Sequence, residues 1–216
     1  MSTFPRLVLF DLDGTLVDSA PDIAAALNAA LVELGHAPHP LPVVTSYVGD
    51  GAAKLVERAA GPTGEVDQAL LLERFKAQYA ANICVQTRPY PGIVDVLAAY
   101  RAAGTPVAVV TNKPGSLART LLRALALDTA FTEILGDGDG FPRKPDPAIA
   151  LHACARHGVP PADTLFVGDG LPDLQLSRAA GIPVAAAVWG YTPREALAAE
   201  HPTWLVAAPS DLLTLG

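Results

Sequence analysis

The stretch that decides the fold is RLVLFDLDGTLVDSAPD, residues 6–22. An apolar run from Leu7 to Phe10 comes first, and Asp11 and Asp13 follow it, one residue apart. Short apolar runs are typical of strands buried in a parallel sheet, and such sheets bind ligands outside the carboxyl ends of their strands. Two neighbouring carboxylates are costly unless a cation neutralises them or one of them holds a proton. The stretch therefore predicts a buried strand that leads into a cation-binding or proton-transferring site.

The composition fits one globular unit and argues against several functional classes. The chain has 216 residues, 50% of them hydrophobic, which is enough to bury a core. No apolar run approaches the roughly 18 residues of a membrane helix, and the N-terminus has no signal-peptide pattern, so we expect a cytoplasmic protein that binds no membrane. With 15 basic against 22 acidic residues the net charge is −7, so nucleic acid is not an expected partner.

Short apolar runs recur along the chain, and amphipathic helical segments lie between them. This alternation predicts an α/β fold, a doubly wound and mostly parallel sheet. We expect strands at 7–10, 107–110, 133–135, 165–167, 184–188 and 204–206, and helices at 116–125, 147–157 and 171–180.

Residues 18–85 interrupt this rhythm because they contain no convincing strand. Apolar residues at helical spacing predict three helices there, at about 21–34, 51–60 and 65–82. We interpret this block as an all-helical cap domain that is inserted after the first strand. The α/β catalytic core is then formed by residues 1–17 and 86–216.

Polar residues follow several of the predicted strands and are expected to meet at one edge of the sheet. They are Asp11 and Asp13, then Thr111 and Asn112, then Asp169 and Asp173, with Lys144 in the loop FPRKPDP. Mg²⁺ prefers oxygen ligands and keeps several waters, so Asp11 and Asp169 are the expected direct carboxylate ligands.

Other chemical motifs fail on their spacing. An EF-hand loop needs glycine at its sixth position, but the loop that starts at Asp11 has Leu16 there and the one that starts at Asp137 has Pro142. In the segment GDGAAK, Lys54 occupies the place of the third glycine of a dinucleotide fingerprint. The chain also has no P-loop lysine motif and no G-x-S-x-G elbow.

Four motifs in order, DLDGT, VVTN, RKPD and GDGLPD, resemble those of haloacid dehalogenase superfamily hydrolases with a helical cap after the first strand. The resemblance implies that Asp11 is a nucleophile that forms an aspartyl-phosphate. It implies that Asp13 is the general acid and base and that Lys144 neutralises the phosphoryl oxygens. Thr111 and the backbone of Asn112 would also bind the phosphoryl group.

The same resemblance implies a Mg²⁺ ion. Its ligands would be the carboxylates of Asp11 and Asp169 and the backbone carbonyl of Asp13. Asp173 is expected to orient Lys144 or a metal-bound water instead of binding the metal. Gly170 stands where many relatives have Ser or Thr.

The expected substrate is a small phosphomonoester, because Asp13 can protonate an oxygen leaving group, and family dehalogenases lack an aspartate there. The segments YVGDGAAKLVERA, RPYPGI, NKP and WGYTPREAL are similar to those of phosphoglycolate phosphatases, which implies 2-phosphoglycolate as the substrate. Lys54 and Arg58 are then candidates for its carboxylate, and Gly49 and Gly51 for a helix N-terminus that faces the site.

Several alternatives stay open. The substrate can be another small phosphomonoester, such as a nucleotide or a sugar phosphate like N-acetylmuramic acid 6-phosphate. A phosphomutase and a non-catalytic binding protein are further alternatives. The sequence does not choose between a monomer and a homodimer.

Overall fold

The computed structural model describes residues 5–62 and 64–215. Its strands are β1 (Leu7–Phe10), β2 (Val17–Asp18), β3 (Arg88–Pro89), β4 (Val107–Pro114), β5 (Glu133–Asp137), β6 (Thr164–Gly168), β7 (Val184–Ala187) and β8 (Trp204–Val206). Six of them form one sheet in the order β5-β4-β1-β6-β7-β8, in which every neighbouring pair is parallel. The predicted doubly wound parallel sheet is confirmed.

Helices lie between most of these strands, and four of them follow β2 in succession. They are α1 (Ala20–Glu33), α2 (Leu41–Thr45), α3 (Ala52–Ala60), α4 (Gln68–Ala81), α5 (Ile93–Ala102), α6 (Gly115–Ala124), α7 (Ala148–His157), α8 (Leu171–Ala180) and α9 (Arg194–Ala199). Single 3-10 turns lie at Asp128–Ala130 and Pro161–Asp163, and a longer 3-10 segment, Pro209–Thr214, follows β8.

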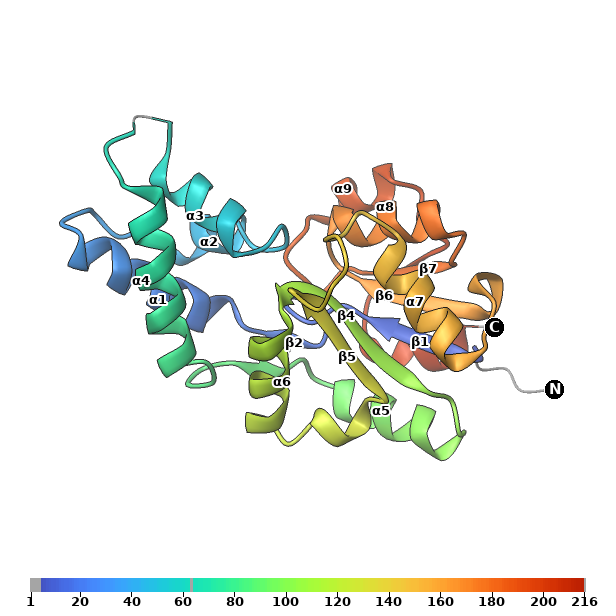
Figure 1. Ribbon diagram of the computed structural model, residues 1–216. Coiled ribbons are helices and arrows are strands. Elements are labelled where there is room, and N and C mark those ends of the chain that lie inside the picture. The colour runs from blue at the N-terminus through green and yellow to red at the C-terminus, as the bar shows by residue number, and fades with distance from the viewer. Residues whose placement is uncertain (1–4, 63, 216) are drawn as a thin grey trace.

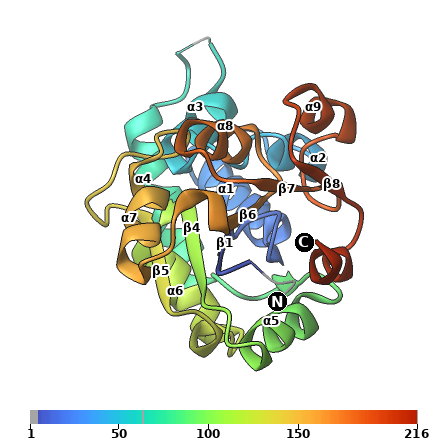
Figure 2. The same ribbon diagram turned by 90° about the vertical axis from the view of Figure 1, so that its right-hand side faces the viewer.

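Every side chain of the central strand β1 is buried because helices cover both faces of the sheet. In β1, Val8 and Phe10 pack into the apolar cluster that includes α5 and α6, whereas Leu7 and Leu9 pack into the cluster that includes α7, α8 and α9. Figure 2 shows α5 and α6 on one side of the strands and α8 and α9 on the other. The chain runs from β1 to β4 and β5 in one direction and later returns to β6 beside β1. This reversal puts the expected ligand-binding edge at the carboxyl ends of β1, β4 and β6.

Helices α1 to α4 form a helical cap that lies beyond one end of the sheet (Figure 1). The short strands β2 and β3 pair antiparallel where the chain enters and leaves the cap. The boundaries 18–85 for the cap and 1–17 with 86–216 for the core stay a prediction. Within those ranges, residues 1–4, 63 and 216 lie outside the described residues.

Some elements differ from the sequence-based expectation. The strands β2 and β3 were not predicted, because two residues are too few to produce a period. Helices α2, α5 and α9 were not predicted either, whereas α8 has the bounds that were expected. Across the described residues, no helix is both long and apolar enough to cross a membrane.

Candidate active site

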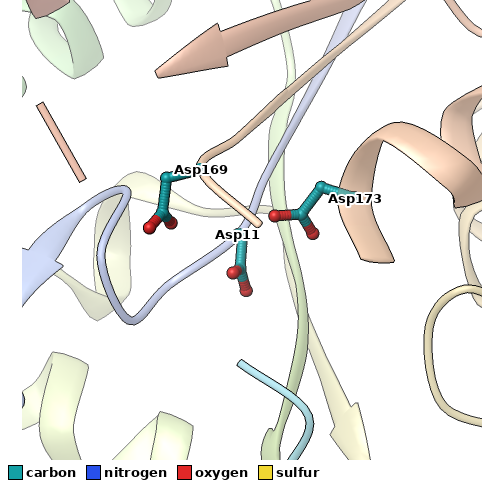
Figure 3. Close-up of side chains that lie close together, drawn as sticks. All are labelled: Asp11, Asp169 and Asp173. Atoms are coloured by element: carbon teal, nitrogen blue, oxygen red, sulfur yellow. The ribbon is translucent and has the colours of Figure 1, made fainter. Parts of the chain in front are cut away.

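Three buried carboxylates, those of Asp11, Asp169 and Asp173, converge at the carboxyl edge of the sheet. One oxygen of each lies within 4.8 Å of the others, and Figure 3 shows the three side chains around a shared space. Their exposed fractions are 6%, 3% and 1%. The site that the sequence predicts from segments about 160 residues apart is therefore brought together by the fold.

Strand pairing explains this convergence. Asp11 directly follows β1 and Asp169 directly follows β6, and these two strands are parallel neighbours. The Asp11 backbone N–H donates to the Val167 carbonyl at 2.9 Å, which extends the pairing to the site. Asp173 lies in the first turn of α8, where its Oδ2 accepts from the Gly170 N–H at 2.9 Å. A carboxylate is stabilised at this end of a helix because the N-terminal end of the helix dipole is positive.

Lys144 supplies a buried ammonium to this acidic cluster. Its Nζ lies 2.7 Å from Asp11 Oδ1 and 2.7 Å from Asp173 Oδ1, and it donates to the Val110 carbonyl at 3.1 Å. Burial by itself lowers the pKa of an ammonium, but the charges of Asp11 and Asp173 outweigh it and raise the pKa of Lys144. The ammonium therefore stays charged at neutral pH.

The charges of the cluster do not balance. Three carboxylates and one ammonium sum to −2 when all are ionised. Burial, followed by the charges of Asp11 and Asp173, raises the pKa of Asp169 to about 8. The contact between Lys144 and Asp11 Oδ1 is an ion pair without hydrogen-bond alignment, so this buried oxygen has no hydrogen-bond partner. A divalent cation would neutralise the excess charge and take up the orphaned oxygen, so the donor set fits Mg²⁺.

Asp169 is held by partners from two loops. Thr15 Oγ1 donates to its Oδ1 at 2.7 Å, and the Tyr191 N–H donates to its Oδ2 at 2.8 Å. The backbone of Gly14 approaches so closely that a Cβ there would lie 2.3 Å from Asp169 Oδ2. Gly14 also has a φ of +90°, which L side chains rarely adopt. Position 14 therefore requires a glycine.

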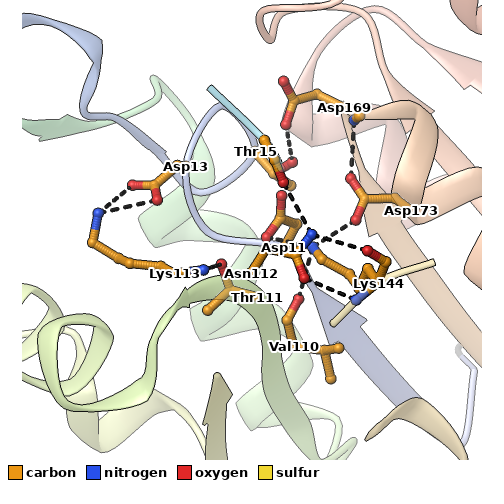
Figure 4. A network of polar contacts seen from close by, with 12 residues as sticks. Asp11, Asp13, Thr15, Val110, Thr111, Asn112, Lys113, Lys144, Asp169 and Asp173 are labelled. Atoms are coloured by element: carbon orange, nitrogen blue, oxygen red, sulfur yellow. Dashed lines mark hydrogen bonds and ion pairs between the residues drawn. The ribbon is translucent and has the colours of Figure 1, made fainter. Parts of the chain in front are cut away.

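The side chain of Asp13 lies apart from the acidic cluster and has its own lysine. Lys113 Nζ donates to Asp13 Oδ1 and Oδ2, both at 3.0 Å, and Ser19 Oγ donates to Oδ1 at 2.6 Å. Figure 4 shows Asp13 and Lys113 on one side of the site, with Lys144, Asp169 and Asp173 on the other. The expected repulsion between Asp11 and Asp13 is therefore relieved by two separate ammonium groups.

Thr111 and Asn112 lie in β4, whose carboxyl end faces the cluster. Both are buried, at 3% and 4% exposed. Asn112 fixes the loop that carries Lys144, because its Oδ1 accepts from the Lys144 N–H at 2.8 Å and its Nδ2 donates to the Lys144 carbonyl at 3.2 Å. The same Nδ2 contacts the Gly49 carbonyl of the cap at 3.1 Å. This leaves the backbone of Asn112, not its side chain, for a phosphoryl group.

A cavity of about 60 Å³ lies between the cap and the core. Asp11, Asp13 and Thr111 line its core side, together with Lys113, and apolar residues line much of the rest. Gly49 and Gly51 also line it, as expected, and Gly51 precedes helix α3. The cavity therefore lies between the nucleophile candidate, Asp11, and residues of the cap.

The two cap cations that the sequence suggested for a substrate carboxylate do not line this cavity. Lys54 Nζ pairs with Glu57 Oε2 at 2.7 Å, and the guanidinium of Arg58 pairs with Asp50. The structure therefore does not bring these two side chains to the cavity.

Three polar residues that line the cavity were not expected from the sequence, Lys76, Tyr79 and Lys113. Lys113 directly follows Asn112 at the end of a buried strand, which was a usable signal. Tyr79 lies in helix α4 of the cap, and its hydroxyl accepts from Lys113 Nζ at 2.7 Å. No pattern in the sequence indicates that this pair forms across the cap and the core.

Comparison with known proteins agrees with the geometry. The family model of haloacid dehalogenase-like hydrolases matches residues 5–181, which include every residue of the acidic cluster. The chain belongs to this family.

Several relatives of this hydrolase share the name phosphoglycolate phosphatase. A phosphoglycolate phosphatase of Nitrosospira multiformis is 45% identical over 86% of this chain and 84% of its own length. Phosphoglycolate phosphatase 1 of Pseudomonas aeruginosa is 40% identical over 97% of this chain and 79% of its own length. The crystal structure of a predicted phosphoglycolate phosphatase from Haemophilus somnus 129pt superimposes with a TM-score of 0.90 at 33% identity and covers 99% of this hydrolase and 98% of its own chain.

Proposed function

We propose that this hydrolase is a Mg²⁺-dependent phosphatase that converts 2-phosphoglycolate to glycolate and phosphate. One observation carries the proposal. A buried Asp11 oxygen without a hydrogen bond lies 2.7 Å from a charged lysine and beside two further carboxylates, and Asp11 lines a cavity. The names of the relatives support 2-phosphoglycolate as the substrate.

Asp11 is the nucleophile in this proposal. Its carboxylate attacks the phosphorus atom, the bond to the alcohol oxygen breaks, and an aspartyl-phosphate forms. Water then attacks the phosphorus atom and releases Asp11 and inorganic phosphate. Phosphate-monoester hydrolysis is among the slowest uncatalysed reactions, and a covalent intermediate divides its barrier into two smaller ones.

Asp13 moves the protons. It donates a proton to the departing alcohol oxygen and later takes one from the attacking water. Its position beside Asp11 in sequence, with its side chain toward the cavity, suits both steps. The hydrogen bonds from Lys113 and Ser19 fix its orientation.

Lys144, Thr111 and the Asn112 backbone bind the phosphoryl group. The Lys144 ammonium stabilises the negative charge that spreads over the phosphoryl oxygens. Asp173 orients Lys144 through their 2.7 Å contact and is not a direct metal ligand in this proposal. When bound by Asp11, Asp169 and the Asp13 carbonyl, Mg²⁺ would supply a second positive charge for the same oxygens.

The test is phosphate release with and without Mg²⁺, on 2-phosphoglycolate, N-acetylmuramic acid 6-phosphate, a nucleoside monophosphate and an aryl phosphate. We expect 2-phosphoglycolate to give the highest kcat/KM, and we expect chelation to abolish turnover and Mg²⁺ to restore it. Asp11→Asn is the matched control, because it keeps the shape of the side chain and removes the nucleophile. Folded wild-type protein that is no faster than this variant on every ester would instead indicate a binding protein, and phosphate transfer to a second alcohol would indicate a phosphomutase.

A further inference from the structure

The phosphoryl end of the site has its cation in Lys144, but the other end of the substrate needs recognition too. Two basic side chains line the described part of the cavity, Lys76 of α4 and Lys113 of β4. Lys76 is exposed, whereas Lys113 is only 7% exposed and has fixed partners. A fixed cation in an apolar cavity binds an anion at a lower entropic cost than a mobile surface lysine.

We infer that the Lys113 ammonium binds a carboxylate on the leaving alcohol, so that this hydrolase selects phosphomonoesters that carry a carboxylate one carbon from the ester oxygen. The inference rests on the proposed function and deepens it. It names the specificity-determining residue and the class of alcohol, a 2-hydroxy acid unit.

The distances favour a short leaving group. Lys113 Nζ lies 3.0 Å from both oxygens of Asp13, and Asp13 must contact the ester oxygen to protonate it. A carboxylate that is one carbon away from the ester oxygen has its own oxygens within about 3 to 4 Å of it. It therefore falls within hydrogen-bond reach of Lys113 on the side of Asp13 that faces away from Lys144 (Figure 4).

Lys113 retains the capacity to bind this group. An ammonium has three N–H donors. Tyr79 accepts one at 2.7 Å, and the symmetric contact to Asp13 can be made by one shared donor. The third N–H donor is then available for a substrate carboxylate.

Tyr79 makes this subsite depend on the cap. Its ring stacks on Phe75 of the same helix at a centroid distance of 5.8 Å, and its side chain is 2% exposed. The hydroxyl reaches Lys113, which belongs to the core. The anion-binding position is therefore complete only when α4 lies over β4, and the cap side of the cavity adds mostly apolar wall around it, from Ile23, Val48, Leu55 and Phe75.

The experiment compares kcat/KM for 2-phosphoglycolate with that for 2-hydroxyethyl phosphate, in which a hydroxymethyl group replaces the carboxylate. In the wild type we expect a ratio of about 100 or more, because a site that is built for a charged group rejects an analogue without it. Lys113→Met should bring the ratio close to one, mainly through a higher KM for 2-phosphoglycolate, and Lys113→Arg should restore part of it. Tyr79→Phe should lower the ratio several-fold.

Two other lysines serve as matched variants. Lys54→Met removes a cap ammonium that is paired with Glu57 outside the cavity and should leave the ratio unchanged. Lys76→Met should also leave it unchanged, and a collapse of the ratio in that variant would assign the carboxylate to Lys76 and overturn the inference. An equal loss for both substrates in Lys113→Met would also overturn it, because it would mean that Lys113 only positions Asp13.

The wild-type ratio decides the matter even where Lys113→Met does not fold. A wild-type ratio near one, with active enzyme, would refute the role of Lys113 and leave the phosphatase proposal intact. Wild-type protein that releases phosphate from no ester would refute the phosphatase proposal itself, so the two failures are distinguishable.

Discussion

Asp22, at the start of α1, connects the segment where the chain enters the cap to the segment where the chain leaves it. Its buried carboxylate accepts from the N–H groups of Val85, Gln86 and Thr87 at 2.9 Å each, and from Thr87 Oγ1 at 2.7 Å. Four donors from one short linker converge on one side chain. We predict that Asp22→Asn destabilises the fold far more than a typical polar substitution.

The magnitude follows from the four contacts. A hydrogen bond to a charged group contributes about 1.5–3 kcal/mol, and a neutral one contributes about 1 kcal/mol. Loss of the charge therefore costs about 1 kcal/mol per donor, and the new amide N–H₂ group faces donors instead of accepting from them. With four donors, we expect the free energy of unfolding to fall by about 4 kcal/mol, measured by urea denaturation at neutral pH.

The effect should depend on pH in a definite direction. Burial by itself raises the pKa of Asp22, but the hydrogen bonds from Thr87, Gln86 and Val85 outweigh it and hold the pKa below its usual 3.8. A carboxylate with a lowered folded-state pKa stabilises the fold above the unfolded pKa, and this stabilisation is lost as the pH falls through the folded value. The difference in the free energy of unfolding between the wild type and Asp22→Asn should therefore become smaller below pH 3.8.

Asp67→Asn is the matched control for this experiment. Asp67 is another cap aspartate, which accepts from the N–H groups of Ala69 and Leu70 at the exposed start of α4. Asparagine replaces aspartate there at little cost, because both are good N-caps. If Asp22→Asn lowers the free energy of unfolding by no more than Asp67→Asn, the account of the linker contacts is refuted.

Three further predictions concern the acidic cluster. Lys144→Met should lower kcat/KM by about 10²–10³-fold because it removes a positive charge that stabilises the phosphoryl group, which steady-state kinetics measures. The same variant should bind Mg²⁺ more tightly because three carboxylates are left without the ammonium, which calorimetry measures. Thr15→Val should weaken Mg²⁺ binding by about 10-fold, since it deletes the donor that orients Asp169, and the Mg²⁺ dependence of activity measures this. Gly14→Ala should destabilise the fold by more than about 1 kcal/mol in urea denaturation, because its Cβ meets Asp169 on a backbone that disfavours side chains; an unchanged midpoint would contradict the steric reading.

The core of the site could be predicted from sequence because its members lie at the end of a buried strand, in a loop between elements or, for Asp173, in the first turn of the helix that follows β6. The pattern that places Asp11 after β1 and Asp169 after β6 is local, and parallel pairing brings such ends together. The same reasoning reached Thr111 and Asn112, which lie within the last residues of β4. Periodicity and polar termini therefore sufficed for the sheet and its acidic edge.

Contacts between the cap and the core could not be predicted in this way. Tyr79 and Lys113 lie 34 residues apart on different layers, and nothing in either segment specifies the other. The donors around Asp22 are mostly backbone N–H groups, which every residue except proline supplies. The residue types of the linker therefore do not indicate that it binds Asp22. Lys54 and Arg58 are the opposite case, because their charge suggested a substrate contact, but neither side chain lines the cavity and both pair with nearby acidic residues.

The arrangement of the charges divides the site into two functional halves. Asp11 and Asp173 share Lys144, and the excess charge on that side requires a cation, which suits a phosphoryl dianion once the cation is bound. Asp13 and Lys113 form a balanced pair on the other side, where the alcohol departs. A phosphoester with an uncharged alcohol would use only the first half, whereas one with a short carboxylate would use both. For this reason, the choice of substrate depends on Lys113 and Tyr79 more than on the motifs that are common to the family.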